Sequence, residues 1–162
     1  MADSDIFPRN KFLVDDNLGR LAKWLRLLGF DTGFYAAVSL PVLSRLANKE
    51  GRIFLTRSKK NAGLKIFDKS LLIKSSGIFE QLRELSPLLV FSPEKMFTRC
   101  SLCNNKLVDI EKERVTGLVP EYVYQNQQRF NICRKCGKIY WQGTHNREIL
   151  QIAKDIFSQD KT

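Results

Sequence analysis

Four cysteines have the types and spacing that most clearly predict chemistry. They form two Cys-x-x-Cys pairs, Cys100 with Cys103 and Cys133 with Cys136. This spacing lets both thiolates of a pair reach one ion, and two pairs complete the tetrahedral four-sulfur shell that suits zinc. Four sulfurs leave no open coordination position, so we expect a structural Zn²⁺. A redox dithiol and four unrelated buried cysteines are the alternatives.

Carboxylates near strand ends form a second candidate centre. Metal-dependent phosphodiester cleavage usually needs two or more carboxylates around one or two divalent cations. Asp15 ends the apolar run KFLVD, Asp16 follows it, and Asp31 lies at or within a second strand-like run. Asp31 could reach the same edge of the sheet as Asp15. Asp16 could instead cap a helix, and Asp31 could lie in a surface turn.

Two groups of cations are placed to flank the same crevice. They are Arg20, Lys23 and Arg26 on a predicted helix, and Arg57, Lys59 and Lys60 in the stretch FLTRSKK after a buried strand. Together they could hold phosphates, whereas a solvated helix face is the alternative for the first group.

The segment YWQGTHNR groups an aromatic residue with polar and basic ones. It contains Trp141, Thr144, Arg147 and the single histidine of the chain, His145. Such a set could stack on bases and contact phosphates. A structural role for His145 is the alternative.

Composition points to a polyanionic partner, with nucleic acid first. The 162 residues carry a formal net charge of +10, which favours phosphate contacts. A basic protein that binds no nucleic acid is the alternative. The acidic start MADSD lacks the pattern of a signal peptide, and no apolar run is long enough for a membrane span. We therefore expect a cytoplasmic protein without membrane contact, where cysteine pairs bind metal more often than they form disulfides.

Strand-like and helix-like segments alternate in the first part of the chain. The predicted strands are residues 11–15, 29–35, 52–56 and 70–74, with a possible last one at 88–91. Asp16 or Asn17 is predicted to cap the first helix, which ends at about 28. The other predicted helices begin at 39–41 and at 78 and end at 50 and 85. This order predicts an α/β fold with a parallel sheet, whose functional crevice lies at the carboxyl ends of the strands.

The composition changes after Pro93, where cysteines appear and the alternation stops. We divide the chain into residues 1–92 and 93–162. The stretch between the cysteine pairs has room for a β-hairpin, and residues 146–157 have the apolar spacing of a closing helix.

Several motifs, taken in order, resemble the Mut-seven carboxy-terminal ribonuclease domain family. They are FLVDDNLGRLAKWLRLLGFDT, GRIFLTRS, the two cysteine pairs and VPEYVYQNQQRFNICRKCGKIYWQGTH. The resemblance implies a PIN-like parallel sheet flanked by helices, followed by a small four-cysteine zinc ribbon. It also implies a metal-dependent ribonuclease that acts on RNA. We expect the metal to be Mg²⁺ or Mn²⁺ and the RNA to be single-stranded.

Residue by residue, the resemblance implies that Asp15 is a metal-binding acid and that the four cysteines are the zinc ligands. Thr56 and Arg57 also match the family's motif at the end of the third strand. Two departures stand out: Ser58 replaces the aspartate that typically follows Leu-Thr-Arg, and residues 36–42 (AAVSLPV) lack the acids expected there. We therefore expect a weakened ribonuclease. The alternative is a catalytically inactive RNA-binding module of an RNA-processing assembly, with protein partners there.

Overall fold

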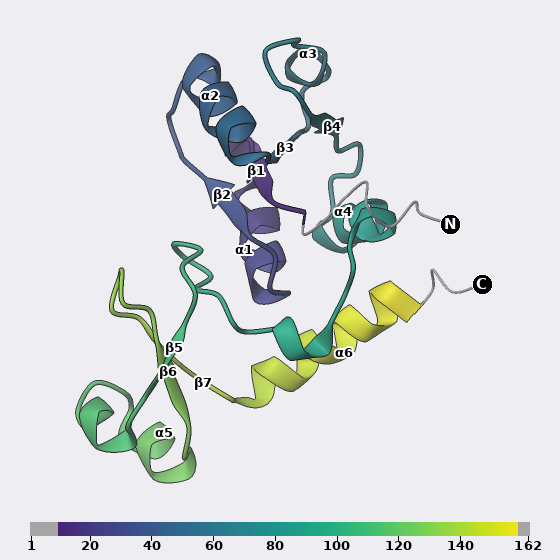
Figure 1. The fold of residues 1–162 in the computed structure, drawn as a ribbon. Coiled ribbons are helices and arrows are strands. Elements are labelled where there is room, and N and C mark those ends of the chain that lie inside the picture. The colour runs from purple at the N-terminus through teal and green to yellow at the C-terminus, as the bar shows by residue number, and fades with distance from the viewer. Residues whose placement is uncertain (1–9, 159–162) are drawn as a thin grey trace, which may run out of the picture.

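Four parallel strands form the central sheet of the computed structural model, which describes residues 10–158. In chain order the strands are β1 (Phe12–Val14), β2 (Thr32–Phe34), β3 (Ile53–Thr56) and β4 (Ser70–Leu72). Their order across the sheet is β2-β1-β3-β4, so β2 and β4 are the edges (Figure 1). The predicted α/β fold with a parallel sheet is confirmed.

Helices cover both faces of this sheet. They are α1 (Gly19–Leu27), α2 (Leu40–Glu50), the short α3 (Lys59–Ala62) and α4 (Ile78–Leu85). Phe12 and Val14 of β1 pack toward α1 and α4, whereas Leu13 packs toward α2. Because both faces are buried, the inner strands β1 and β3 are apolar runs that do not alternate with polar residues.

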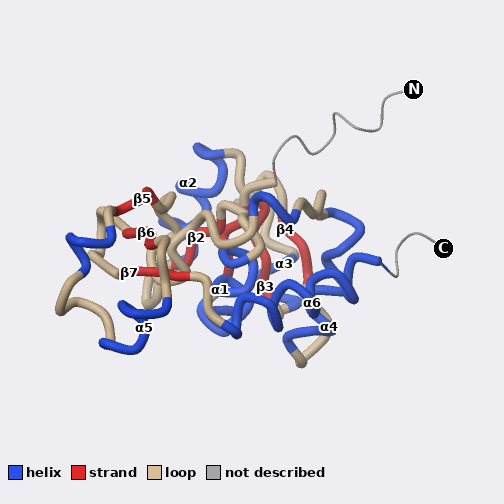
Figure 2. Tube along the Cα trace, turned by 90° about the horizontal axis from the view of Figure 1, so that it is seen from below, coloured by secondary structure: helices blue, strands red, loops and turns tan. Residues whose placement is uncertain are grey.

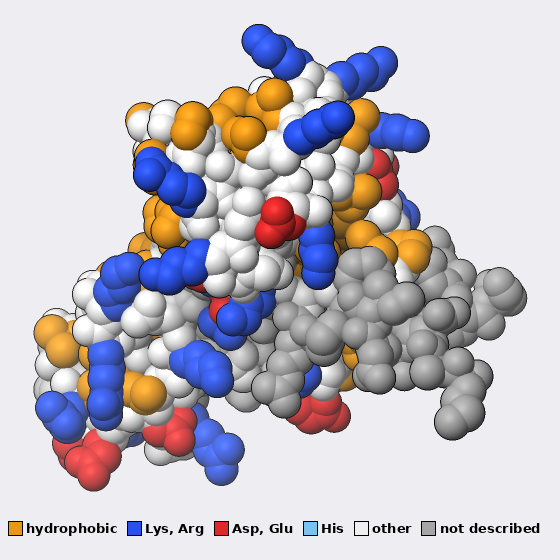
Figure 3. All heavy atoms as spheres, turned by 45° about the horizontal axis from the view of Figure 1, so that its top comes forward, with side chains coloured by type: hydrophobic (Ala, Val, Ile, Leu, Met, Phe, Trp, Pro, Cys, Tyr) orange, Lys and Arg blue, Asp and Glu red, His pale blue; other side chains and the backbone are white. Residues whose placement is uncertain are grey.

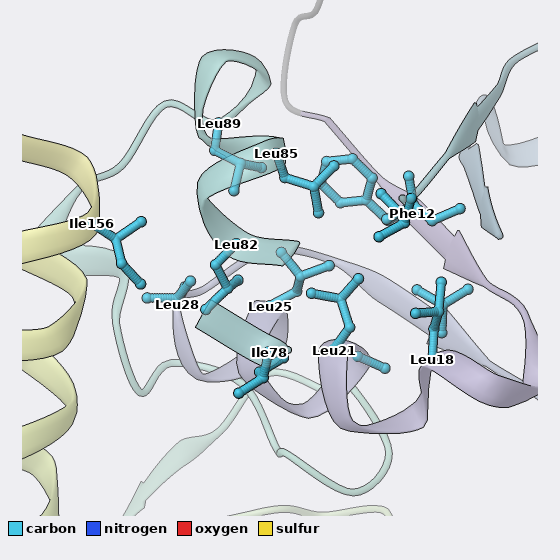
Figure 4. Packing of buried hydrophobic residues seen from close by; sticks show 14 of the residues in the cluster. Phe12, Leu18, Leu21, Leu25, Leu28, Ile78, Leu82, Leu85, Leu89 and Ile156 are labelled. Atoms are coloured by element: carbon cyan, nitrogen blue, oxygen red, sulfur yellow. The ribbon is translucent and has the colours of Figure 1, made fainter. Parts of the chain in front are cut away.

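The larger core lies between the sheet, α1 and α4. Leu21 and Leu25 of α1 recur at helical spacing with Leu28 directly after it, and Leu82 and Leu85 meet them from α4 (Figure 4). All five are at most 2% exposed. One helix stripe packed on another in this way accounts for the spacing seen in the sequence.

The beginning of α1 differs from the sequence prediction. A 3-10 turn, Asp16–Leu18, precedes the helix, and Asp15 caps it by accepting the N–H of Asp16 at 2.9 Å. The prediction that Asp16 or Asn17 is the cap is therefore wrong. Asp15 is the residue with extended backbone, so its side chain can turn back to the free N–H groups.

Residues 88–91 are not a strand. Pro87 lies in the first positions of a 3-10 turn, Ser86–Leu88, and Val90 is 80% exposed. Proline favours such a turn because its φ is fixed and it has no N–H to donate to a sheet. Phe91 stacks on Phe157 with ring centroids 4.6 Å apart, so the apolar residues of this segment serve packing against the closing helix.

A second sheet follows, formed by β5 (Val108–Ile110), β6 (Phe130–Ile132) and β7 (Ile139–Trp141), all antiparallel. The 3-10 turn Lys112–Val115 and α5 (Glu121–Asn126) lie between β5 and β6. A further 3-10 turn, Pro93–Lys95, lies in the segment that connects α4 to the second sheet, which we call the linker. Figure 2 shows this sheet and α5 on one side of the parallel sheet.

Helix α6 (Thr144–Ser158) is the predicted closing helix. It returns to the first part of the chain, where Ala153 and Ile156 join the core formed by α1 and α4 (Figures 1 and 4). The division between residues 92 and 93 stays a prediction. None of the helices within residues 10–158 is long and apolar enough to cross a membrane.

Candidate functional site

The four cysteine sulfurs converge on one point. All of them lie within 4.8 Å of one another, with Cys100 Sγ 3.6 Å from Cys136 Sγ and Cys103 Sγ 3.2 Å from Cys133 Sγ. Sulfurs in a tetrahedral zinc shell lie roughly 3.8 Å apart when each Zn–S bond is about 2.3 Å. The cluster therefore fits a structural metal ion, and the second part of the chain is consistent with a zinc ribbon.

Two turns of the same geometry hold the cysteine pairs. Cys100 N–H donates to Asn105 O at 2.8 Å, and Asn104 N–H donates to Cys100 O at 2.9 Å. In the second turn Cys133 pairs with Lys138 and Gly137 at 2.9 and 2.8 Å. Asn104 and Gly137 both have positive φ, 68° and 76°, which these two residue types tolerate best.

The protein environment favours a thiolate at one cysteine of the cluster. Burial raises the pKa of Cys100, but the Tyr140 hydroxyl and the N–H groups of Cys103 and Leu102 outweigh burial and lower that pKa to about 6. Burial and the neighbouring Cys133 thiol raise the pKa of Cys103 to about 12. Four adjacent thiolates repel each other, and a divalent cation would remove this cost.

Asp15 directly follows β1. It lies at the carboxyl edge of the parallel sheet, which is the side where the strands end. Its Oδ2 accepts hydrogen bonds from Thr56 Oγ1 at 2.6 Å and Asn61 Nδ2 at 3.1 Å. Ser58 caps α3, since its Oγ accepts the Asn61 N–H at 3.2 Å. The carboxylate is thus held by the end of the neighbouring strand and by the short helix that follows it.

This edge offers oxygen ligands that suit one hard cation. Asp15 is half-buried, and Asp16 beside it is exposed. Mg²⁺ is commonly held by one or two carboxylates together with waters and substrate phosphates. Asp15 and Asp16 are carboxylates of the kind that would hold one such cation. Within residues 10–158, however, the cysteine cluster is the sole grouping of three or more metal-ligating side chains, so the edge does not gather the acids of a two-metal centre.

Exposed cations surround this edge. Arg57, Lys59 and Lys60 are all exposed directly after β3, and Arg20 and Lys23 are exposed on α1. On the face drawn in Figure 3, lysine and arginine side chains predominate over acidic ones. The surface has the charge that phosphates require.

Arg26 does not belong to this exposed group. It is 4% exposed, and its guanidinium donates to Thr32 O at 2.8 Å and to the carbonyls of Ser101 and Leu102 at 3.0 Å. The interpretation of Arg26 as part of a solvated or phosphate-binding helix face is therefore wrong. The residue ties α1 to the edge strand β2 and to the first cysteine turn.

Asp31 lies at the opposite end of the sheet from Asp15. It precedes β2, and its neighbour Thr32 pairs with Phe12 at the start of β1. The three residues of β1 span roughly 10 Å, and this length separates the end of the sheet at Asp31 from the end at Asp15. The expectation that Asp31 reaches the same edge is wrong, because it rested on placing this acid at or within the strand.

An ion-pair network occupies Asp31. Its carboxylate accepts from Arg52 at 2.6 Å and from Asn104 at 2.7 Å, and Arg99 lies 3.8 Å away. Burial raises the pKa of Asp31, but these donors and charges outweigh burial and lower it below its ordinary value. The network joins the parallel sheet to the cysteine-bearing part, which is a structural role.

Two of the residues predicted beyond Trp141, His145 and Arg147, differ in their surroundings. His145 is 89% exposed and lies 3.6 Å from Glu148. Arg147 is exposed beside a hollow that Trp141 also lines.

The chain matches the Mut7-C RNAse domain family over residues 10–153, nearly its whole length. It belongs to this family. Membership confirms the resemblance read from the motifs and points to a nuclease-like function on RNA. Neither curated proteins nor solved structures gave a match to the chain.

Three contributors to these sites escaped the sequence reasoning. They are Asn61, Asn104 and Tyr140. Asn61 stands three residues after Ser58, the spacing of a helix cap and its partner, and that signal could have identified α3. Asn104 and Tyr140 act across long sequence distances and have no local signal.

Proposed function

We propose that this Mut7-C chain is a divalent-metal-dependent endoribonuclease with weakened activity, built on a PIN-like fold. The active site in this proposal is the carboxyl edge of the parallel sheet. The observation that carries it is Asp15, whose carboxylate is oriented by Thr56 and Asn61 at the kind of edge where open sheets bind ligands.

Each side chain at the edge has a distinct task in this proposal. Asp15, with Asp16 beside it, would hold Mg²⁺ or Mn²⁺, which supplies positive charge for the phosphate and a more acidic water. Thr56 and Asn61 keep the carboxylate in one orientation. Arg57, Lys59 and Lys60 hold the phosphates of the RNA strand on either side of the scissile bond.

Weak activity follows from the shortage of acids. Ser58 stands where an acid is expected, and its hydroxyl caps α3. A neutral oxygen contributes less than a carboxylate to holding a divalent cation. With Asp31 at the other end of the sheet, Asp15 and Asp16 are left as the acids of the site.

An RNA-binding module without catalysis is the second candidate. One observation favours it: both carboxylate oxygens of Asp15 already accept hydrogen bonds from the protein. In that case the cations would bind RNA for a larger RNA-processing assembly, and Asp15 would be a helix cap.

Cleavage of end-labelled single-stranded RNA with Mg²⁺ or Mn²⁺ tests the proposal. Asp15→Asn should abolish metal-dependent cleavage, whereas the exposed Asp68→Asn, before β4, should leave it unchanged. Cleavage that survives Asp15→Asn would exclude this edge as the active site. Salt-sensitive RNA binding without cleavage by the wild type would instead establish the module.

A further inference from the structure

A hollow of about 600 Å³ lies where the linker, the second sheet and α6 meet. Its lining includes the aromatic residues Phe97, Tyr140 and Trp141 and two arginines, Arg99 and Arg147. The other polar lining residues are the amides Asn131, Gln142 and Asn146, with Thr98 and one acid, Glu94. Aromatic faces, amides and guanidinium groups around one space are the chemistry that receives an unpaired base and its phosphate.

We propose that this hollow binds an unpaired nucleotide of single-stranded RNA, with the base against Trp141 and the phosphate at Arg147. The inference rests on the proposed function only in taking RNA as the ligand class. It adds a second RNA-contacting site, distinct from the edge around Asp15.

The two arginines of the hollow have different duties. Arg99 donates to Gly29 O at 3.3 Å and Asn104 O at 3.0 Å and lies close to Asp31, so it is held in the wall. Arg147 forms no ion pair or hydrogen bond through its side chain with the residues between 10 and 158 that the structure describes. Its charge is therefore available to a phosphate.

The metal cluster supports the aromatic wall. The Tyr140 hydroxyl shares a hydrogen bond with Cys100 Sγ at 3.1 Å and accepts the Ser101 N–H at 3.1 Å. Lys138 Nζ lies 5.2 Å from the centre of the same ring. A ring fixed at its hydroxyl gives up little rotational freedom when a ligand packs nearby.

The hollow and the candidate active site lie at opposite ends of α1. Leu27, the last residue of α1, lines the hollow, whereas Asp15 precedes the helix. Nine residues of helix span about 13 Å, and Arg20 and Lys23 are exposed along them. An RNA strand of several nucleotides would be needed to contact both sites.

Binding of a labelled single-stranded RNA 12-mer, followed by fluorescence anisotropy at several salt concentrations, tests this proposal. Trp141→Ala should weaken binding about 5- to 150-fold, the range that loss of one base stack produces. Trp141→Phe should retain most of the affinity and shows that any loss is not a folding defect. Arg147→Gln should weaken binding and reduce the salt slope by about 1.

The matched control is Lys154→Gln, which removes an exposed cation from α6 outside the hollow. It should have a smaller effect than Arg147→Gln. Equal effects of these two variants, or unchanged binding by a folded Trp141→Ala, would overturn the proposal. So would a duplex RNA that competes as well as the single strand.

Intrinsic fluorescence provides a second readout. The chain has two tryptophans, and Trp24 packs edge-on against Phe79 in the core. With Trp24→Phe as background, RNA should quench Trp141 directly, and no quenching would contradict stacking. Asp15→Asn should lose cleavage but keep this quenching, whereas Trp141→Ala should raise KM and leave kcat. Binding therefore remains decisive even if the wild type does not cleave.

Discussion

The side-chain amide of Asn104 donates to Asp31 at 2.7 Å and accepts the Thr32 N–H at 3.0 Å. Asn104, which closes the first cysteine turn, thus accepts a backbone N–H of the edge strand β2 of the parallel sheet. Edge strands carry unpaired N–H and C=O groups that need partners. Here a side chain of the metal-binding part supplies one, so the two parts of the chain are joined by directional hydrogen bonds as well as apolar packing.

Asp31→Asn should destabilise the protein by about 3 kcal/mol, because it leaves Arg52 and Arg99 without their carboxylate in a part-buried place. Urea unfolding would measure the change in the free energy of unfolding. The exposed Asp68→Asn should change it by less than about 0.5 kcal/mol. Metal-dependent cleavage by the folded fraction of Asp31→Asn should remain at the wild-type level, and a specific loss of cleavage would restore a catalytic role for Asp31.

The same carboxylate predicts a pH dependence. The pKa of Asp31 in the folded protein lies below its ordinary value of 3.8, so its ionised form stabilises the fold. This contribution is present above that ordinary value and is lost as pH falls through the lower folded pKa. The difference in unfolding free energy between wild type and Asp31→Asn should therefore be constant near neutrality and shrink below about pH 4. A difference that grows on acidification would refute this account.

Gly29→Ala should cost more than about 3 kcal/mol. Gly29 has a φ of 94°, and a Cβ there would lie 2.3 Å from Lys95 O. Gly117→Ala is the matched control, because its φ is 73° but no atom would lie within 4 Å of the added Cβ. It should show backbone strain alone, about 1 kcal/mol. Thermal unfolding of the two variants separates the cost of the close contact from the cost of backbone strain. Equal losses of stability would show that the backbone at Lys95 moves to make room for the added Cβ.

Metal analysis of protein purified without chelator should find about one zinc per chain. Chelation should lower the melting temperature, since the first cysteine turn supplies Ser101 and Leu102 carbonyls to Arg26 of α1. Zinc added back should restore it. Cys103→Ser should behave like the chelated protein, whereas Ser101→Ala should keep its metal. An unchanged melting temperature after the metal is removed would show that the ion has no structural role.

Local patterns predicted much of this fold. Continuous apolar runs identified β1 and β3, and helical spacing identified α1, α2 and α4, because each pattern reports burial within a few residues. The Cys-x-x-Cys pairs identified their cluster for the same reason, since both the turn and the ligand spacing are local.

Those local patterns could not predict which end of a strand a residue occupies or how neighbouring strands are paired. The stretch around Asp31 looked like a strand, but only the pairing of Thr32 with Phe12 shows which end of β2 the acid occupies. The position of Arg26 in the helical pattern predicts an exposed residue, but the first cysteine turn covers it in the structure. In both cases a partner 20 or more residues away decides the role, and no periodicity reports such a partner.

Helix α6 has a consequence for the order of folding. Ile156 completes the core that begins at Phe12, so residues at nearly opposite ends of the described chain must meet before that core is dry. Topologies with such distant pairings fold slowly. During synthesis the cysteine turns leave the ribosome before α6 does, so metal capture can precede the closing of the first core. Zinc supply during translation would then influence the yield of folded protein and not only the lifetime of the finished molecule.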